Sequence, residues 1–357
     1  MIPALLLLTL AAPSAEVFSA VDVETAHTSN VYMDSSEEWD LGMLARGELG
    51  LDFDPFWSVG YTGEVSIFSQ HPELNAHFHE LYAFLNPVFG EETRTDLMVE
   101  LRLSTLRNDD EYQALNYLLP GLAVELGIEP AQWLRARISA DVAYRWFYDA
   151  PTTNAVDGWA KASLAANLPT RTTVSTWARM GARWFTQVPT GVEDDRDLQL
   201  EVAAHIGQGL WPKAGLQLDY VYRRAFGPSG LLLQSLTDAQ VNNVGTEFLY
   251  SGHLASVGVK QVIVPGAWVQ AFLRVESRNY EGWPAYDAAL AATGEDRKDL
   301  RVSPGARVAW AILPDSEDSP WPRLDLSAEY RYLSQDSNSD PFDTSAHLTF
   351  ISARATW

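Results

Sequence analysis

The sequence predicts an all-β protein, a transmembrane antiparallel up-and-down β-barrel of about 16 strands. Apolar and charged side chains alternate along strand-length stretches, and short turns, most of them with Pro, alternate with longer acidic loops. Tryptophans gather beside the short turns, and the last residue is Trp357. In a bilayer only helices and closed barrels satisfy every backbone polar group. Because no apolar run after residue 15 is long enough for a spanning helix, the barrel is the predicted fold.

The turns divide the chain into strands. Pro cannot donate to a β-ladder, so it marks strand ends. The short turns are predicted at 54–55, 86–90, 129–130, 168–169, 211–212, 265–266 and 314–320. The strands are predicted at 17–28, 40–53, 56–69, 75–87, 93–106, 113–128, 132–148, 158–168, 171–187, 198–210, 213–226, 245–263, 267–280, 298–313, 321–334 and 345–357. An even number places both chain ends on the short-turn side, which is periplasmic in bacterial barrels, with the longer acidic loops extracellular. The same pattern is compatible with about 14 or 18 strands.

The stretch 132–148 shows the alternation most clearly. Leu134, Ala136 and Ile138 share one face, whereas Arg135 and Arg137 share the other. A strand with one apolar and one polar face fits a wall between lipid and a wet interior.

Aromatic placement distinguishes this barrel from a soluble sandwich, which also alternates. One group of tryptophans lies near the short turns: Trp57, Trp133, Trp211, Trp268, Trp321 and Trp357. A second group lies near the longer loops: Tyr144, Trp146, Trp184, Tyr220, Tyr222, Tyr330 and Tyr332. Two aromatic belts are typical of membrane interfaces.

Residues 1–15 have the apolar core and small residues of a secretory signal peptide, although no Lys or Arg precedes the apolar stretch. A mispredicted start codon is the alternative. Residues 16–357 are then predicted to form one barrel domain.

The chain has no cysteine, which excludes disulfides and an acylated Cys anchor. The net charge of −22 argues against a nucleic-acid partner.

The final segment, LTFISARATW, places Ile351, Ala353, Ala355 and Trp357 on one face and resembles the C-terminal strand of bacterial outer-membrane β-barrels of the porin type. Most members of that class end in Phe rather than Trp. The resemblance implies a Gram-negative outer membrane, lipid as the surroundings, and recognition of the last strand by the barrel-assembly machinery. The segments HTSNVYMD (27–34) and DLGMLARGELGLDF (40–53) resemble the opening hairpin of barrels associated with exopolysaccharide secretion.

The polar faces of the strands are predicted to line the pore. The candidate pore-lining residues are Arg102, Arg135, Arg137, Arg145, Arg179, Arg183, Arg223, Arg274, Arg301, Arg307, Glu100, Asp141, Asp219 and Glu276. A barrel of about 16 strands leaves an aqueous lumen, where such charges bind hydroxyl-rich or anionic cargo. Alternatively, the same charges form cross-strand pairs that rigidify the wall. No cofactor or metal motif is present.

Two features of the charge and loop pattern lead to further expectations. The arginines of 132–148 and 171–187 form a strip with few acids nearby in the sequence, typical of an anion-preferring wall. Of the two longest loops, 228–244 and 281–297, one is expected to fold inward and narrow the lumen, or else to cover the rim. A short helix is predicted from Tyr286 to Ala292.

The predicted function is passage of hydrophilic solutes or a secreted polysaccharide through a polar, Arg-lined lumen. The first alternative is a plugged barrel that anchors a larger envelope export complex. The second is an outer-membrane lipase, in which His77 and His79, on one face of a strand, could bind a metal or activate a Ser. Because no catalytic motif accompanies them, no enzyme is predicted.

Overall fold

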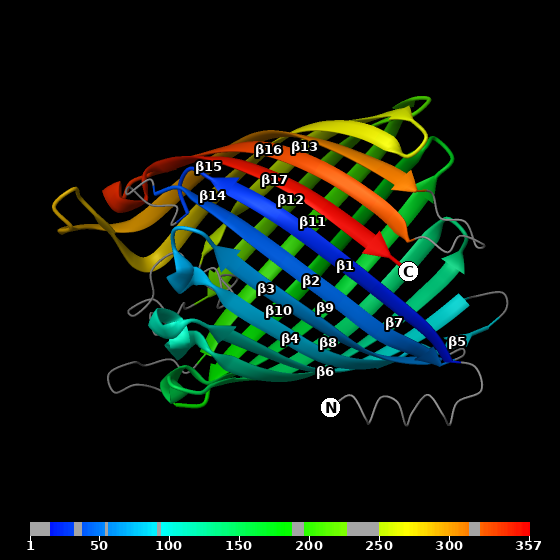
Figure 1. The fold of residues 1–357 in the computed structure, drawn as a ribbon, viewed down its shortest axis with the longest axis horizontal. Helices are drawn as coiled ribbons and strands as arrows, with labels where there is room; N and C mark the ends of the chain where they lie inside the picture. Colours follow the sequence, from blue (N-terminus) through cyan, green and yellow to red (C-terminus); the bar gives the residue numbers. More distant parts are fainter. Residues whose placement is uncertain are drawn as a thin grey trace.

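The computed structural model describes residues 15–31, 38–53, 56–90, 94–187, 196–226, 250–313 and 322–357. They form one antiparallel sheet that closes on itself, as Figure 1 shows. Closure is made by the first strand, which pairs with the second strand on one side and with the last strand on the other. The predicted all-β up-and-down barrel is therefore confirmed.

The strands follow one another around the wall in chain order. They are β1 (Ala15–Thr28), β2 (Asp40–Phe53), β3 (Trp57–Phe68), β4 (Ala76–Leu85), β5 (Val88–Phe89), β6 (Arg94–Asn108), β7 (Tyr117–Ala131), β8 (Leu134–Phe147), β9 (Ala155–Leu168), β10 (Thr172–Phe185), β11 (Arg196–Trp211), β12 (Ala214–Phe226), β13 (Ser251–Val264), β14 (Ala267–Tyr286), β15 (Ala292–Leu313), β16 (Arg323–Ser337) and β17 (Thr344–Thr356). The two-residue β5 directly follows β4 and pairs with the same strand, β6, so β4 and β5 together cross the wall once. The wall therefore has 16 spanning strands.

Loops at one end carry short 3-10 helices: η1 (Pro72–Leu74), η2 (Asp110–Leu115), η3 (Pro151–Thr153) and η5 (Asp340–Phe342). No helix among the described residues is long and apolar enough to cross a membrane.

The short turns and the longer loops lie at opposite ends of the barrel (Figure 1). Strands β7 and β8 are separated by two residues, and so are β11–β12 and β13–β14. Gly266, with φ +82°, takes the left-handed conformation that a tight turn requires at little cost. The predicted turns at 54–55 and 314–320, Trp321 and most of the predicted signal peptide lie outside the described residues.

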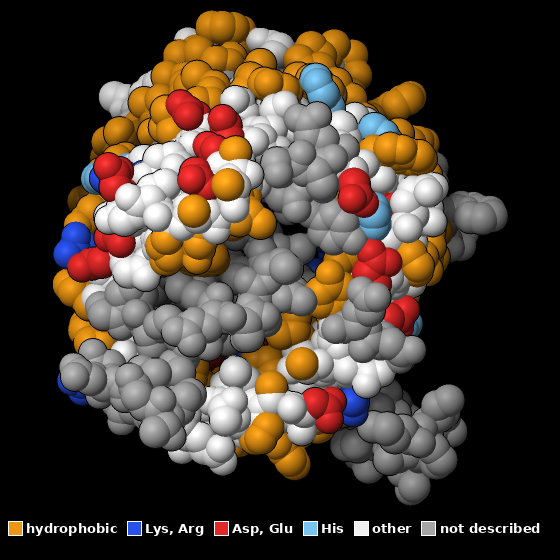
Figure 2. Space-filling model, turned by 90° about the vertical axis from the view of Figure 1, so that its left-hand side faces the viewer, with side chains coloured by type: hydrophobic (Ala, Val, Ile, Leu, Met, Phe, Trp, Pro, Cys, Tyr) orange, Lys and Arg blue, Asp and Glu red, His pale blue; other side chains and the backbone are white. Residues whose placement is uncertain are grey.

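The outer face of the wall is apolar, as the alternation predicts. Ile138 and Leu101 are 66% and 59% exposed, although both are large aliphatic side chains. Figure 2, which looks onto the loop end, shows hydrophobic side chains around the circumference. Such exposure is unfavourable in water and matches a lipid-facing surface.

The aromatic belts are present with one correction. The exposed turn-end tryptophans include Trp57, Trp133, Trp211 and Trp357. Trp268 instead faces inward, because its outward-facing neighbour on β14 is Val269, and its ring lies 3.9 Å from Lys260 Nζ. The sequence places Trp268 next to a turn but does not show to which side its side chain points.

The predicted helix from Tyr286 to Ala292 is wrong. Strands β14 and β15 extend past their neighbours as a hairpin that pairs Tyr280 with Arg297 and Tyr286 with Ala292. The hairpin continues the wall beyond the rim (Figure 1) and packs on η5. The second long loop, 228–244, lies outside the described residues.

Arg297 fastens this hairpin. Its guanidinium is fully buried, bonds to Asp299 Oδ2 at 2.8 Å, and lies 3.4 Å from the ring centre of Phe342 in η5. We expect Arg297→Ala to detach the hairpin from η5, because the cation–π contact with Phe342 is lost, and to weaken β15 itself, because buried Asp299 loses this ion pair. The rate of proteolytic cleavage follows the fraction of molecules in which the hairpin is detached. A loss of about 1.4 kcal/mol in the stability of the docked hairpin should therefore speed limited proteolysis near Leu290 at least about tenfold. Lys298→Ala, which alters an exposed neighbour, should leave the rate unchanged.

Candidate pore lining

The structure places all the predicted pore-lining residues on the inward faces of the strands. In β8, for example, Ile138 and Val142 are exposed on the outer face, whereas Arg137 and Asp141, the residues directly before them, lie on the opposite face. The inward faces of neighbouring strands meet, so their charges contact one another. Whether these residues contact a solute stays a prediction.

Asp157 holds one cluster together. Its carboxylate accepts two hydrogen bonds from Arg183, at 2.6 and 3.1 Å, and one from Arg145 at 3.2 Å. Asp157 is 6% exposed and Arg183 2%. Asp197, which is also buried, lies opposite Arg183 in the register. Burying such charges is costly unless they are paired and bonded.

Glu201 joins a second cluster across β10, β11 and β12. The carboxylate is 1% exposed and bonds Arg179 on one side and Arg223 Nε, at 2.6 Å, on the other. Strand β11 lies between β10 and β12, so one acidic side chain reaches a cation on each neighbour.

Tyr250 continues this cluster to β14. Its hydroxyl accepts a hydrogen bond from Arg223 and donates one to Glu276 Oε1 at 2.8 Å. Burial raises the pKa of Tyr250 to about 12, so the phenol keeps its proton at neutral pH. Glu276 also accepts from Arg278 at 3.0 Å.

The predicted one-sided basic strip is wrong, since each of its arginines has an acidic partner. Arg137 pairs with Glu125 at 2.8 Å, Arg135 pairs with Glu129, and the other three are described above. The partners come from the neighbouring strands β7, β9 and β11. The sequence alone does not show which residues of those strands lie opposite the arginines. The register of neighbouring strands therefore neutralises most of the strip, as the alternative of cross-strand pairing predicts.

Several inward residues were missed by the sequence analysis. Asp157 was excluded because the predicted strand began at residue 158. Glu201 alternates in step with Ala203 and His205 along β11, so the period of two was by itself enough to predict that Glu201 faces inward. Trp159 and Trp177 also face inward, with Arg179 Cζ at 4.2 and 5.8 Å from their ring centres.

A recess of about 180 Å³ in the inner wall is lined mainly by cationic side chains. Its polar lining consists of Arg274, Glu276, Arg278, Arg301, Ser303 and Arg331. Arg301 bonds the neutral amide of Gln335. Four arginines line this recess with one carboxylate, Glu276, and Arg331 also pairs with Glu329 beside it, so cations still outnumber acids and the recess attracts anions.

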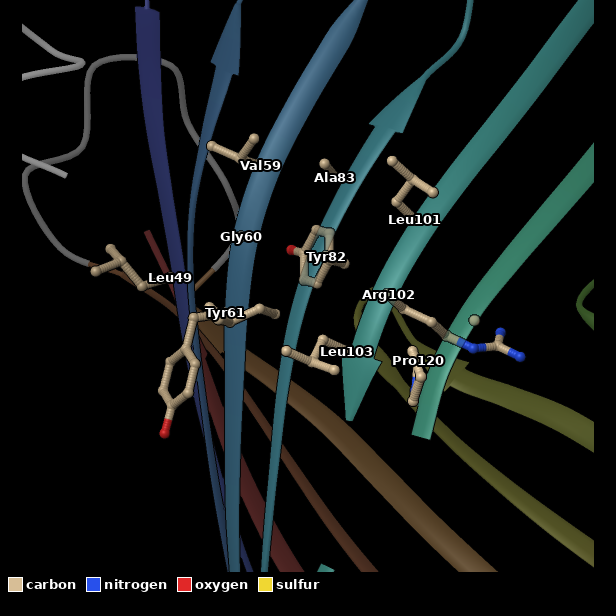
Figure 3. Close-up of a pocket in the computed structure, with 12 residues that line it drawn as sticks. Leu49, Val59, Gly60, Tyr61, Tyr82, Ala83, Leu101, Arg102, Leu103 and Pro120 are labelled. Carbon is tan, nitrogen blue, oxygen red and sulfur yellow. The ribbon is translucent and has the colours of Figure 1, made fainter. Parts of the chain in front are cut away.

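The larger hollows lie on the outer face. One of about 430 Å³ is lined by Leu49, Tyr61, Leu101 and other apolar side chains of β2 to β7. Figure 3 shows Leu49 and Tyr61 together on one side, with the Arg102 guanidinium directed away from them. This hollow faces lipid and is not part of the lumen.

His77 and His79 also face outward on β4, and Tyr61 Oη lies 2.7 Å from His79 Nδ1. They therefore do not lie in the lumen with Glu80, which is on the opposite face of the same strand. Within the described ranges no group of three His, Asp or Glu side chains is placed to hold a metal.

Comparison with solved structures gives the same fold. OccAB2 of Acinetobacter baumannii matches with a TM-score of 0.50 and 10% identity over 97% of this chain and 98% of that chain. OccAB1 of the same organism has a TM-score of 0.50 and 9% identity over 97% of both chains. The outer membrane protein OpdK of Pseudomonas aeruginosa has a TM-score of 0.47 and 9% identity over 96% of this chain and 99% of that chain. The chain thus has the fold of the outer-membrane porins, a closed antiparallel β-barrel.

No protein-family model and no curated protein sequence matches the chain. At these identities the likeness concerns the fold, and the function has to be argued from the lumen itself.

Proposed function

We propose that the protein is an outer-membrane channel through which small hydrophilic solutes diffuse. The observation that carries the proposal is a closed wall of 16 strands, apolar outside and charged inside. A barrel of this size is too wide for side chains to fill and leaves an aqueous passage. The polar inner wall keeps that passage wet and lowers the cost of moving a solute through it.

Small anions are the cargo class that we propose. Arg274 and Arg278 share Glu276, and Arg331 pairs with Glu329. Arginines therefore still outnumber carboxylates in the recess, and its field favours anions. A volume of about 180 Å³ accommodates a carboxylate or phosphate group. This favours a small anionic solute over a secreted polysaccharide, which needs a continuous binding strip.

Planar-bilayer recording tests the channel. Stable conductance steps from the purified, folded barrel are expected. A silent barrel with a correct heat-modifiable gel shift would instead support the alternative, a plugged barrel that anchors an envelope complex.

The charge of the recess should set ion selectivity. Replacing Arg301 and Arg331 with Gln removes two positive charges from the recess and keeps polar side chains there. Loss of about one kT of local potential lowers the anion-to-cation permeability ratio about threefold. Reversal potentials in a salt gradient measure this ratio.

Arg135→Gln combined with Arg323→Gln is the matched control. These arginines also face inward, but both are half-exposed and neither lines the recess. The control should change the ratio less than the recess variant. Equal ratios in the wild type and the recess variant would remove the recess from the conduction path.

We also propose that the assembly machinery recognises β17, which ends next to Trp357. Support comes from the position of β17, whose pairing with β1 closes the barrel.

A further inference from the structure

Basic and histidine side chains gather on the outer face at the loop end of the barrel. We call this group the outer basic belt. Its members on the outward faces of the strands are His27, His77, His79, Arg107, Arg196, Arg224, His253, Lys298 and His347. The belt contains five of the seven histidines of the chain. In Figure 2 the pale-blue histidines appear towards the periphery of this end.

A repeated contact fixes three of these histidines. Tyr61 Oη lies 2.7 Å from His79 Nδ1, Tyr220 Oη 2.8 Å from His253 Nδ1, and Tyr330 Oη 2.7 Å from His347 Nδ1. In every case the tyrosine lies diagonally across the strand pair, opposite the residue two positions after the histidine. Where the tyrosine donates to Nδ1, the neutral ring carries its proton on Nε2 and presents an N–H donor towards its surroundings.

Two arginines stand beside belt histidines. Arg107 lies opposite His77 in the register, and its Cζ is 4.3 Å from the ring centre of Tyr148. Within the described part of the chain Arg107 makes no ion pair. Arg224 lies on β12 two residues after Tyr222, and Tyr222 is opposite His253 in the register. The contact of Arg224 with Glu281 is loose, at 4.0 Å, and joins two half-exposed side chains. Each arginine thus keeps donors for a further acceptor.

The sign of the belt is opposite to that of the protein. The chain carries a net charge of −22, yet the only acidic side chains on the outward strand faces of the described barrel wall at this end are Glu281, Asp296 and Asp336. Further from the loops, the described outward faces are apolar across the membrane thickness. Cations confined to the height at which the apolar band ends are placed to meet lipid headgroups, and the acidic loops above them are not.

We propose that the outer basic belt binds the phosphorylated headgroups of lipids in the leaflet at the loop end, with Arg107–His77 and Arg224–His253 as two binding sites. Guanidinium groups and imidazole N–H groups donate to phosphate oxygens, and the flanking tyrosines cover the adjoining glycerol or sugar region. This proposal concerns the outer face and does not depend on an open lumen.

Native mass spectrometry of the full-length barrel tests the proposal. The detergent-solubilised protein is titrated with bis-phosphorylated lipid A and, separately, with phosphatidylcholine, and the bound lipids are counted. Lipid A should be retained in preference to phosphatidylcholine. In the variant Arg107→Gln/Arg224→Gln, lipid A affinity at each site should fall about fivefold, as expected when one cation beside an anionic lipid surface is removed.

The matched control carries the same charge change on the inner face, Arg135→Gln/Arg323→Gln, and should bind lipid A like the wild type. Both variants must show the heat-modifiable gel shift of the folded barrel. If the arginine variant does not fold, His77→Gln/His253→Gln replaces it, with a smaller loss of lipid A expected. Equal retention by belt variant and wild type, equal loss in both variants, or no preference over phosphatidylcholine would overturn the proposal.

Discussion

Ile138→Arg is expected to destabilise the folded barrel by about 2–4 kcal/mol, the cost of a cation near the bilayer midplane on the lipid face. Ile138 is the fifth residue of the 14 in β8, and its side chain is 66% exposed on the outer face. The guanidinium would lie in hydrocarbon, where it loses its hydration. Urea unfolding in phosphatidylcholine vesicles, followed by tryptophan fluorescence, measures the change.

Ala123→Arg is the control for this experiment. Ala123 faces inward on β7 and lies opposite Asp141 and Glu100 in the register. An arginine there meets water and two carboxylates, so the free energy of unfolding should change by less than about 1 kcal/mol. If the two substitutions cost the same, or Ala123→Arg costs more, the assignment of the two faces is wrong.

Asp157→Asn is expected to cost about 3–5 kcal/mol of stability, because it removes a buried carboxylate that pairs with two guanidinium groups at once. Asp157 is the acidic partner of both Arg145 and Arg183. Asparagine keeps the shape and can accept a hydrogen bond, but it does not neutralise either cation. The same urea titration measures the loss.

Asp325→Asn is the comparison for a solvated pair. The Asp325 side chain is 37% exposed and pairs with Arg323, which is 50% exposed. Surface pairs contribute about 0–1 kcal/mol, so this change should be small. A cost for Asp157→Asn no larger than that for Asp325→Asn would mean that water already screens the cluster.

Much of the fold was predictable from the sequence because a β-strand is described by a local period of two. The predicted strand at 40–53 coincides with β2, and the start of β14 at residue 267 was also predicted. The Pro-marked turns placed most strand ends within a few residues. The hairpin of 281–297 was missed, because Arg297 and Phe342, whose contact supports it, are far apart in the chain.

The candidate site was predictable only in part. The alternation indicates that Arg179 and Arg183 face away from lipid. It does not reveal that Glu201 and Asp157 lie next to them, since that depends on strand register. The recess of Arg301 and Arg331 likewise needs the placement of β14, β15 and β16 side by side.

The sequence by itself determined that this chain is a lipid-facing β wall, because side-chain periodicity and aromatic position are local properties that need no knowledge of neighbouring strands. The tertiary structure alone decided which charges cancel, which remain in the recess, and which histidines share a height on the outer face. The reason is that these contacts join residues through strand pairing, and the pairing register is fixed by the closure of the whole sheet.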